Sequence, residues 1–355
     1  MRTMNRVAVH VMQIAAMVAC LLLVVVGCDS TSQKKYIRNS GFVFGTQYNF
    51  TYKSDKDLSD VILARLDKYD KSVSVYTEGS LMQQLNNGME VEGDTDMIRV
   101  ITMAKEFNEM SEGAFDITVE PLSKLWRFSD ERKDDTISVA EWNALLAKLD
   151  TIKPYVGLDK VTIEGRMIKK ADRRIKLNAN AIAEGYGIDL AASVLEEHGV
   201  TDYMVEIGGE IHCKGLNSKG QKWRIGIERP IEGSSFIDRR EQCIIQLTDC
   251  AVSTSGGYRQ CWHVADGRRV QHTINPATGL PVTHNMQSVT VVGKSTAVTD
   301  ALCTTLMVAG PDKALELVGK FQDAEAYIIF FDEEGNMRED MTEGFRDLII
   351  ERNKN

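Results

Sequence analysis

Two short stretches of small and hydroxyl-bearing residues are the part of this sequence best suited to chemistry. They are residues 251–258 (AVSTSGGY) and residues 272–279 (HTINPATG). Loops of this composition offer many backbone N–H groups with little side-chain bulk, which suits a phosphate-bearing ligand. His272 opens the second stretch, and a histidine titrates close enough to neutral pH to act as a base. Ordinary turns have the same composition, so these residues alone leave both interpretations open.

An acid and a hydroxyl four positions apart, Asp300 and Thr304, form a second candidate group. On a helix expected over about residues 300–308, the two side chains project from one face. A carboxylate and a hydroxyl oxygen in this arrangement can ligate a hard cation such as Mg²⁺. The alternative is an acid at the start of a helix that is stabilised by the helix dipole.

Three further segments place polar groups or glycines where a ligand can approach. Residues 115–122 (FDITVEPL) set an acid and a hydroxyl beside an apolar run that a proline interrupts. Residues 178–186 (NANAIAEGY) lead into a helix whose start can approach an anion. Residues 207–211 (IGGEI) end a strand with paired glycines, which allow a close approach of the backbone to a ligand. Each segment is also compatible with a simple turn, and the joint occurrence in this order favours a site.

Apolar periodicity indicates the elements that must position these residues. Helical spacing runs through residues 58–69 and 97–107, and a capping box from Ser138 to Glu141 opens a further helix. Helices are also expected over about residues 181–198 and 313–321, and β-rich runs cover 203–207, 223–228, 244–247, 288–292 and 327–331. Helices cluster early and strands late, without regular β-α-β alternation. This order predicts an α+β fold rather than a doubly wound sheet.

The first 27 residues predict a lipoprotein signal segment. Arg2 and Arg6 precede an apolar stretch over residues 7–26, and small residues stand before Cys28, which is expected to be lipidated as the mature N-terminus. The alternatives are an uncleaved anchor, because the apolar run is about long enough to span a membrane, and processing at Cys20. Residues 28–40 are interpreted as a polar tether, and residues 41–355 as the folded domain.

Charge and cysteine content exclude two classes of protein. Removal of residues 1–27 takes away two arginines and no acid, which leaves 40 basic and 51 acidic side chains and a net charge of −11. Such a balance argues against a general nucleic-acid binder. The five cysteines that follow Cys28 are irregularly spaced and odd in number, so they do not form a disulfide framework.

The candidate segments, taken together, occur in an order that resembles the ApbE family of FAD:protein FMN transferases. The resemblance covers nearly all of the mature chain and implies an α+β fold with mixed and antiparallel sheets packed by helices. In chain order, the motifs that carry it are Phe44-Gly45-Thr46, Tyr76…Ser80, Ala114-Phe115-Asp116-Ile117-Thr118, Asn178…Ala181-Ile182-Ala183-Glu184-Gly185-Tyr186, Gly208-Gly209-Glu210, Ser253-Thr254-Ser255-Gly256-Gly257-Tyr258, His272-Thr273-Ile274-Asn275-Pro276 and Asp300…Thr304.

The resemblance implies roles for individual residues. Family members usually have methionine at the position of Phe44, whose ring can fill that place by stacking, and commonly have aspartate and lysine at the positions of Asn178 and Glu184. The metal is typically Mg²⁺, held by the backbone carbonyl of Ala181 and by the side chains of Asp300 and Thr304, and His272 is the candidate base. The implied FAD contacts are Phe44, Tyr76, Ala114, Phe115, Asp116, Asn178, Glu184 and Ile274.

The implied reaction is transfer of FMN from FAD to a threonine or serine hydroxyl of an acceptor redox protein, with release of AMP. The expected acceptor is a flavoprotein subunit of a membrane redox complex, reached from a lipid anchor on the extracytoplasmic, periplasmic side. One alternative is an FAD pyrophosphatase, in which water replaces the hydroxyl and FMN and AMP are released. The other is a non-catalytic FAD-binding lipoprotein, against which the Asp300 and Thr304 pair argues, since a carrier has less need of a metal.

Overall fold

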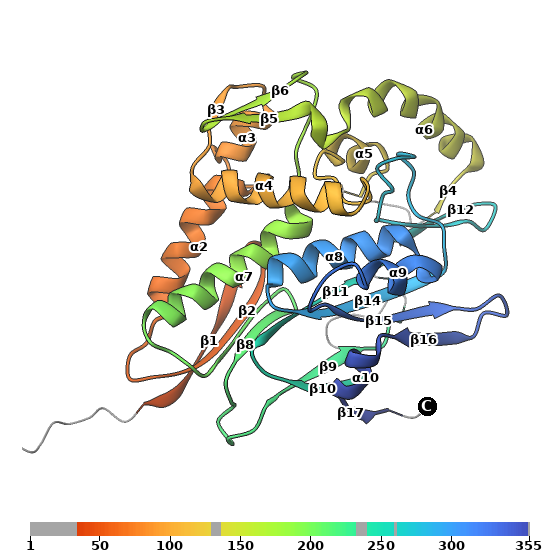
Figure 1. Ribbon diagram of the computed structural model, residues 1–355. Coiled ribbons are helices and arrows are strands. Elements are labelled where there is room, and N and C mark those ends of the chain that lie inside the picture. The colour runs from red at the N-terminus through yellow and green to blue at the C-terminus, as the bar shows by residue number, and fades with distance from the viewer. Residues whose placement is uncertain (1–33, 129–135, 232–239, 259–260, 354–355) are drawn as a thin grey trace, which may run out of the picture. The chain divides into compact units, whose positions relative to one another are not determined.

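An eight-stranded sheet carries most of the fold (Figure 1), and from β2 to β16 every neighbouring pair of strands is antiparallel. The strand β14 is buried along its whole length, because other elements cover both faces of the sheet. In spatial order the strands are β1 (Lys35–Val43), β2 (Thr46–Ser54), β7 (Tyr203–Ile207), β8 (Glu210–Lys214), β11 (Cys250–Gly256), β14 (Met286–Gly293), β15 (Glu325–Phe331) and β16 (Met337–Met341).

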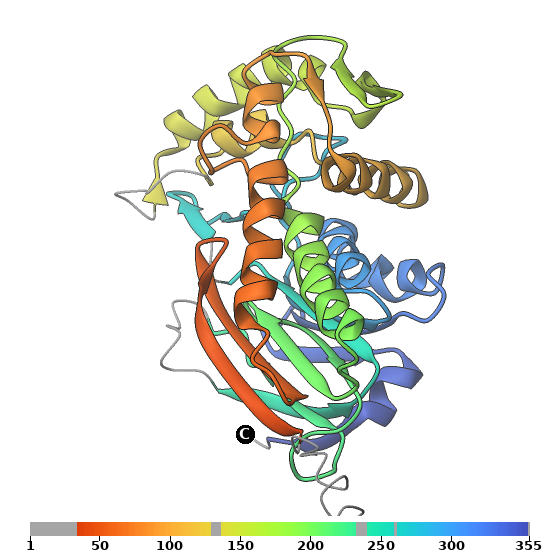
Figure 2. The ribbon, with the colours of Figure 1, turned by 90° about the vertical axis from the view of Figure 1, so that its left-hand side faces the viewer.

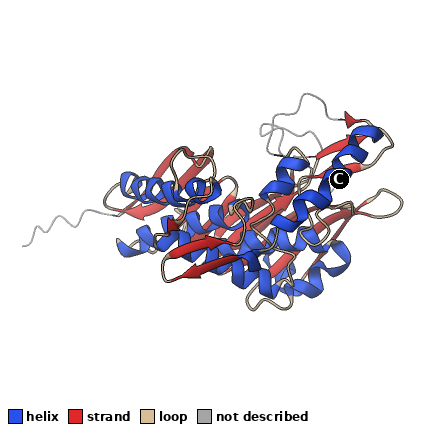
Figure 3. Cartoon of the chain, turned by 90° about the horizontal axis from the view of Figure 1, so that it is seen from above, coloured by secondary structure: helices blue, strands red, loops and turns tan. Residues whose placement is uncertain are grey.

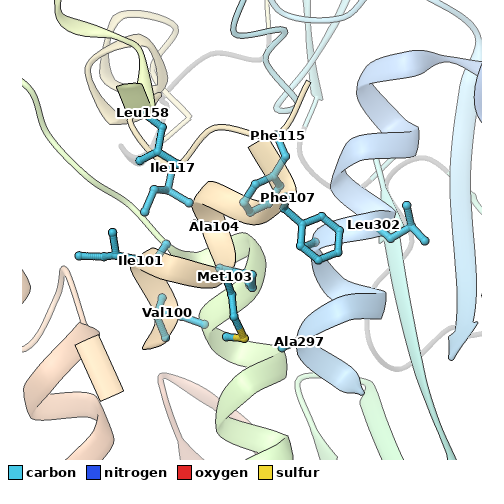
Figure 4. Packing of buried hydrophobic residues seen from close by; sticks show 14 of the residues in the cluster. Val100, Ile101, Met103, Ala104, Phe107, Phe115, Ile117, Leu158, Ala297 and Leu302 are labelled. Carbon is cyan, nitrogen blue, oxygen red and sulfur yellow. The ribbon is translucent and has the colours of Figure 1, made fainter. Parts of the chain in front are cut away.

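Helices cover one face of this sheet. Val289 and Val291 of β14 and Ala326 and Ile328 of β15 point into a core that these helices share. Figure 4 shows part of this core, where α4 residues such as Phe107 lie between Phe115 and Leu302, and Figure 2 shows α2 and α7 over the β1–β2 end of the sheet. The helices of this layer are α2 (Ser59–Val73), α4 (Thr95–Met110), α7 (Asn180–Glu197), α8 (Thr296–Ala309) and α9 (Pro311–Val318).

A three-stranded sheet and a short helix cover the opposite face. Val292 of β14 and Tyr327 and Ile329 of β15 belong to a second core with Ile225 and Ile245 of this smaller sheet. The alternation of neighbouring residues between the two cores follows the two-residue period of a strand. The elements of this layer are β9 (Trp223–Glu228), β10 (Glu241–Leu247), β17 (Ile349–Arg352) and α10 (Glu343–Leu348).

Some of the remaining described elements surround a smaller aromatic core that contains Trp126, Trp142 and Trp262, and the others contribute residues such as Met82 and Ile168 to the core beneath the helices. The helix α6 begins with the predicted capping box, because the Ser138 and Glu141 side chains each bond the backbone of the other residue. These elements are α3 (Leu81–Asn86), β3 (Val91–Glu92), α5 (Glu120–Leu125), β4 (Thr136–Ile137), α6 (Val139–Ile152), β5 (Val161–Glu164), β6 (Met167–Lys170), β12 (Cys261–Val264), β13 (Arg269–Gln271) and the 3₁₀ turns η1 (Lys153–Tyr155) and η2 (Leu158–Lys160).

Helices and strands both run through the described chain (Figure 3), and the strand β4 joins β12 in parallel. The predicted α+β class with mixed and antiparallel sheets is therefore confirmed. Two expectations were wrong. Strands β1 and β2 precede every described helix, so the chain does not place its strands only late. Residues 250–256 form the strand β11 rather than a loop, because they pair with both β8 and β14.

The computed structural model describes residues 34–128, 136–231, 240–258 and 261–353. The larger of two compact units comprises Tyr36–Lys53 and Asp57–Asn355, and the features of the fold and of the site belong to this unit. The predicted signal segment 1–27 and Cys28 lie outside the described residues, and β1 begins at Lys35, inside the range 28–40 predicted as a tether. No described helix combines the length and the apolar character needed to cross a membrane.

Candidate active site

The helices α7 and α8 approach each other at Gly185. A Cβ atom on this glycine would lie 2.4 Å from the Thr296 carbonyl oxygen and 2.9 Å from the Ala297 Cα atom. No side chain fits in that space, so only glycine permits this contact between the two backbones. The close packing brings the first turns of α7 beside the first turns of α8.

Asp300 lies at this crossing. Its Oδ2 atom accepts a hydrogen bond of 3.2 Å from the Gly185 backbone N–H. In an α-helix the same N–H points toward the carbonyl of Ala181, four residues earlier, so the Ala181 carbonyl and the Asp300 carboxylate face the same place. Thr304 follows Asp300 by one turn on the same side of α8. Helix geometry therefore places the Ala181 carbonyl near the Asp300 carboxylate, with Thr304 one turn further along α8.

The position of Asp300 in α8 also decides between the two interpretations of this acid. The helix begins at Thr296 with Ser295 as its N-cap, four residues earlier than expected from the sequence. Asp300 is buried in the second turn, whereas the effect of the helix dipole is confined to the first turn. An acid that only stabilises a helix start does not fit this place.

Two further carboxylates neighbour Asp300. Burial raises the pKa of Glu184, on α7, to about 7. Burial and then the charges of Asp300 and Glu184 raise the pKa of Glu210 on β8 well above its ordinary value. Burial and then the charge of Glu184 likewise raise the pKa of Asp300. Three acids in one buried place favour either protonation of their carboxyl groups or a bound cation.

The Oε2 atom of Glu210 is buried, and no described residue forms a hydrogen bond with it. A hard cation prefers oxygen ligands of the kinds gathered here: carboxylate, hydroxyl and backbone carbonyl. The described residues hold no group of three or more His, Cys, Asp or Glu side chains arranged for a metal. The predicted set needs only one such side chain, Asp300, so the residues present fit a magnesium ion.

Asp189 fixes α8 against α7 and β8. Its Oδ1 atom accepts hydrogen bonds of 2.8 Å from the Thr296 N–H and from His212, and its Oδ2 atom accepts one of 2.6 Å from the Ser295 hydroxyl. Burial acts to raise the pKa of Asp189, but the hydrogen bond and charge of His212 outweigh it and the pKa is lowered. The carboxylate thus caps the start of the helix that carries Asp300.

A cavity of about 270 Å³, here called the aromatic cavity, lies beside α7. Phe44 sits in the β1–β2 turn with a positive φ of 54°, and its ring packs edge-on to Tyr69 at 6.0 Å between centroids. The Tyr69 hydroxyl donates to the Ala183 carbonyl at 2.7 Å. Tyr76 is 74 % exposed. The lining residues are Phe44, Gly45, Tyr69, Asp70, Val73, Ser74, Tyr76, Thr77, Asn180, Ala183 and Glu184.

A second cavity of about 490 Å³, here called the histidine cavity, contains His272 in its lining. The turn between β7 and β8 borders it, with both glycines in the left-handed region at φ 64° for Gly208 and 102° for Gly209. Tyr258, in the turn after β11, also lines the cavity, and the other lining residues come from strands: Met204, Glu206, Glu210, Ile211, Arg224, Ile225, Gly226, Ile227, Glu228, Thr254, Ser255 and Gly256.

The two cavities meet where Glu184 touches Gly208. A Cβ atom on Gly208 would lie 2.1 Å from the Glu184 Oε1 atom, so the carboxylate lies directly against the glycine backbone. Glu184 lines the aromatic cavity and Gly208 lines the histidine cavity. The two cavities are therefore neighbours, with the Glu184 carboxylate and Gly208 forming the wall between them.

Five of the residues predicted to contact FAD line neither cavity. Phe115 and Ile274 are buried in the core. Asp116 accepts bonds from the Thr118 N–H at 2.7 Å and the Leu158 N–H at 3.0 Å, and burial raises its pKa against these bonds. The remaining two are Ala114, in the turn before Phe115, and Asn178, whose side-chain amide donates to Glu120 at 2.8 Å.

Other residues of the site were not assigned a role from the sequence. Tyr69 was recognised only as part of a helical spacing, although its hydroxyl reaches α7. Glu210 belongs to the motif Gly208-Gly209-Glu210, and the paired glycines before it were the signal that could have identified it as a site residue. Asp189 carried no signal of a role, and β9 was predicted as a strand but not as part of the site, because the roles of both depend on contacts with segments far away in the sequence.

Ser253 and Thr254 differ from the expectation of a phosphate-binding loop. The Ser253 hydroxyl pairs with the Thr299 hydroxyl and the Thr254 hydroxyl with that of Thr290, both at 2.8 Å. The first pair joins β11 to α8, and the second pair joins β11 to β14 within the sheet. Thr254 still borders the histidine cavity together with Ser255 and Gly256.

This chain is similar in sequence and in fold to several flavin transferases. The family model described as "ApbE family" matches residues 44–328. An FAD:protein FMN transferase of Vibrio cholerae is 35% identical over 303 residues, which are 83% of this chain and 87% of that protein. One from Haemophilus influenzae is 32% identical over 318 residues, 85% of this chain and 89% of that protein.

Solved structures agree with the sequence comparison. The flavin transferase ApbE of Vibrio cholerae superposes with a TM-score of 0.75 at 33% identity, over 89% of this chain and 99% of that one. The apo form of the Pseudomonas stutzeri flavinyl transferase ApbE gives 0.74 at 32% identity, over 89% and 97%. The extent of these matches shows that this chain belongs to the ApbE family.

Proposed function

We propose that this chain transfers FMN from FAD to a threonine or serine hydroxyl of an acceptor redox protein and releases AMP. The observation that carries the proposal is the junction of the two cavities beside Asp300. One cavity is lined by aromatic rings and the other by His272 and a glycine turn. The names of the relatives, FAD:protein FMN transferase, support the same reaction.

In this proposal the isoalloxazine ring binds in the aromatic cavity, between Phe44 and Tyr76. Aromatic rings prefer offset or edge-on contacts with a flat ligand, and both residues line the cavity. The pyrophosphate is proposed to lie at the start of α7, where the positive end of the helix dipole favours an anion. Gly209 leaves open space for phosphate oxygens on the opposite side, whereas the Glu184 carboxylate already fills the space beside Gly208.

The Mg²⁺ ion is proposed to be held by the Ala181 carbonyl, the Asp300 carboxylate and the Thr304 hydroxyl. When bound, it offsets negative charge on the phosphate oxygens. Glu210 adds a carboxylate next to Asp300, and the close packing at Gly185 keeps the ligands from α7 and α8 at a fixed spacing.

His272 is the proposed base. Its imidazole accepts the proton of the acceptor hydroxyl while the hydroxyl oxygen forms a bond to the FMN-side phosphorus. The bond from that phosphorus to the bridging oxygen breaks, and AMP leaves with that oxygen. The products are FMN joined to the acceptor through a phosphoester, AMP, and one proton on His272.

We also propose that the mature chain is attached to the membrane through a lipid on Cys28 and faces the periplasm. The support is the basic start, the apolar stretch and the small residues before Cys28. A lipid anchor places the enzyme beside an acceptor subunit of a membrane redox complex. A Cys28→Ser variant is expected to accumulate as an unprocessed precursor, and normal lipid labelling of that variant would contradict the assignment.

The decisive experiment combines the purified chain without its first 28 residues, FAD, Mg²⁺ and an acceptor containing a reactive threonine. The acceptor should gain the mass of one FMN, and AMP should appear in equal amount. Free FMN with no adduct, across several acceptors, would show a pyrophosphatase instead. Binding of FAD without any turnover would show a carrier.

A further inference from the structure

The strands β8 and β11 place two cysteines directly opposite each other. Cys213 of β8 is the antiparallel partner of Cys250 of β11, and both thiols are free in the structure. Opposite residues of an antiparallel pair have Cα atoms about 4.5–5.5 Å apart, and a disulfide bond joins residues whose Cα atoms are about 4.4–6.8 Å apart. The register of the two strands therefore holds this pair at a spacing that one disulfide bond can bridge.

The two thiols also contact each other. The hydrogen bond between them is the largest influence on both groups: it raises the pKa of Cys213, which burial raises further, and it lowers the pKa of Cys250. The Cys213 S–H is thus the donor and the Cys250 sulfur the acceptor. Burial and the charge of Asp249 act to raise the pKa of Cys250, and the charge of Lys294 acts to lower it. A sulfur that accepts a hydrogen bond beside a cation has the character of a thiolate nucleophile.

The two cysteines differ in their access to solvent. Cys213 is fully buried in the core between the large sheet and the strands β9 and β10, whereas Cys250, the first residue of β11, is partly exposed. A reagent from solvent therefore reaches the Cys250 sulfur first, and the Cys213 sulfur lies directly behind it. Neither residue lines the aromatic cavity or the histidine cavity.

Two other described cysteines lack such a neighbour among their printed partners and show the contrast. Cys243 of β10 stands opposite Ile227 on one side and Arg352 on the other. The Cys303 thiol of α8 donates to the Ser253 carbonyl at 3.3 Å. Cys243 is buried like Cys213, which makes it the matched control for the pair.

We infer that Cys213 and Cys250 form a reversible oxidation site, which takes a small disulfide compound as its oxidant and closes into a disulfide bond between β8 and β11. The Cys250 thiolate attacks one sulfur of the compound, forms a mixed disulfide and releases one thiolate. Cys213 then attacks the Cys250 sulfur, closes the bond and releases the second thiolate. Two electrons pass from the cysteines to the compound, and the two thiol protons pass to the released thiolates.

This site goes beyond the proposed transferase function and does not depend on it. The bond joins two central strands of the large sheet. The strand β8 begins at Glu210, and on β11 the Ser253 hydroxyl pairs with that of Thr299 on α8 at 2.8 Å. The link therefore ties together the strands beneath the candidate active site without entering either cavity.

Thiol counting tests the inference on the chain without its first 28 residues, which retains five cysteines. The reduced chain is incubated with oxidised glutathione, quenched with acid, unfolded and alkylated with N-ethylmaleimide, and its intact mass is measured. Two of the five thiols should escape alkylation without any bound glutathione, and peptide mapping should find Cys213 linked to Cys250. Treatment with dithiothreitol should restore all the thiols.

Three serine variants provide the matched comparison. Cys213→Ser should stop at the mixed disulfide, with one glutathione held on Cys250. Cys250→Ser should react with oxidised glutathione at least about tenfold more slowly than Cys213→Ser, because the remaining thiol of the pair is buried. Cys243→Ser should close the same link as the wild type at the same rate. Circular dichroism checks that each variant is folded.

Several outcomes would overturn the inference: full alkylation of the treated wild type, a lasting glutathione adduct on its Cys250, equal rates for Cys213→Ser and Cys250→Ser, or loss of the link in a folded Cys243→Ser. These readouts contain neither FAD nor an acceptor. Failure of the proposed transferase function would therefore leave them unchanged.

Discussion

The aromatic cavity and the histidine cavity share a wall but are built from different structures. Helices and a tight turn make the first, and they present rings whose positions are fixed by packing, as for Phe44 against Tyr69. Strands and strand ends make the second, and they present backbone groups, carboxylates and His272. The first is suited to holding a flat ligand, and the second to moving a proton. Substitutions in the aromatic cavity should therefore change the affinity for FAD, and substitutions in the histidine cavity should change the rate of transfer.

Removal of the Asp300 charge, in the proposed metal site at the crossing of α7 and α8, should have the largest effect. Asp300→Ala is expected to lower the rate of AMP release by about a thousandfold or more, because a metal contributes several kcal/mol to the transition state. The comparison with Asp300→Asn keeps the side-chain size and separates charge from packing. Calorimetric titration with Mg²⁺ should show weakened binding in both. An unchanged rate in Asp300→Ala would remove the metal site as proposed.

His272→Ala should act within the histidine cavity and lower the transfer rate by about 10²- to 10⁴-fold, the usual contribution of a general base. The loss should shrink at higher pH, where the acceptor hydroxyl gives up its proton more readily. His263→Ala, on the neighbouring strand β12 and outside both cavities, serves as the control and should retain the wild-type rate. A flat ratio of rates across pH would argue that His272 only orients the substrate.

Glu184→Gln tests the carboxyl group at the boundary between the cavities by its effect on the free energy of unfolding. The pKa of Glu184 is raised from 4.5 to about 7 in the folded chain, so the unfolded chain loses this proton first as the pH rises. The native carboxyl therefore lowers stability progressively between pH 4.5 and about pH 7. Replacing it should stabilise the protein by roughly 1–3 kcal/mol at pH 8 and by little at pH 4. Urea unfolding without Mg²⁺ or FAD measures this difference, and equal gains at both pH values would contradict the assignment.

Tyr76→Ala should have the smallest effect and one confined to binding. The side chain is 74 % exposed, so unfolding free energy should change by less than about 0.5 kcal/mol. Loss of the ring should raise the Kd for FAD about three- to tenfold. Tyr76→Phe keeps the ring but loses the bond from Asn180, and should lie closer to wild type. An equal loss of affinity in the two variants would assign the contribution to the hydroxyl.

Local signals in the sequence predicted much of the fold. The capping box at Ser138 is present, and α7 starts one residue before its expected position. The strand β1 was missed because its residues alternate only between partly buried and exposed, which leaves little apolar contrast. The start of α8 was missed because Thr296 and Thr299 are not apolar, and contacts with Asp189 and Ser253 satisfy them only in the folded chain.

The candidate site was predicted in part. The grouping of Asp300 with Ala181 is supported by the bond to Gly185, and Phe44, Tyr76 and Glu184 do share a cavity. The position of β9 in the same cavity as His272 could not be predicted, because it depends on the pairing of whole strands and not on residues 223–228 alone.

The absence of a side chain at Gly185 also determines how the site responds to its ligands. Since α7 and α8 touch through their backbones there, the carbonyl of one helix and the carboxylate of the other are held apart by the main chain itself. Their spacing is set when the protein folds, and an arriving cation finds it already formed. The entropy of ordering these ligands is lost during folding rather than during binding, so the empty and loaded enzymes should share one arrangement of the two helices.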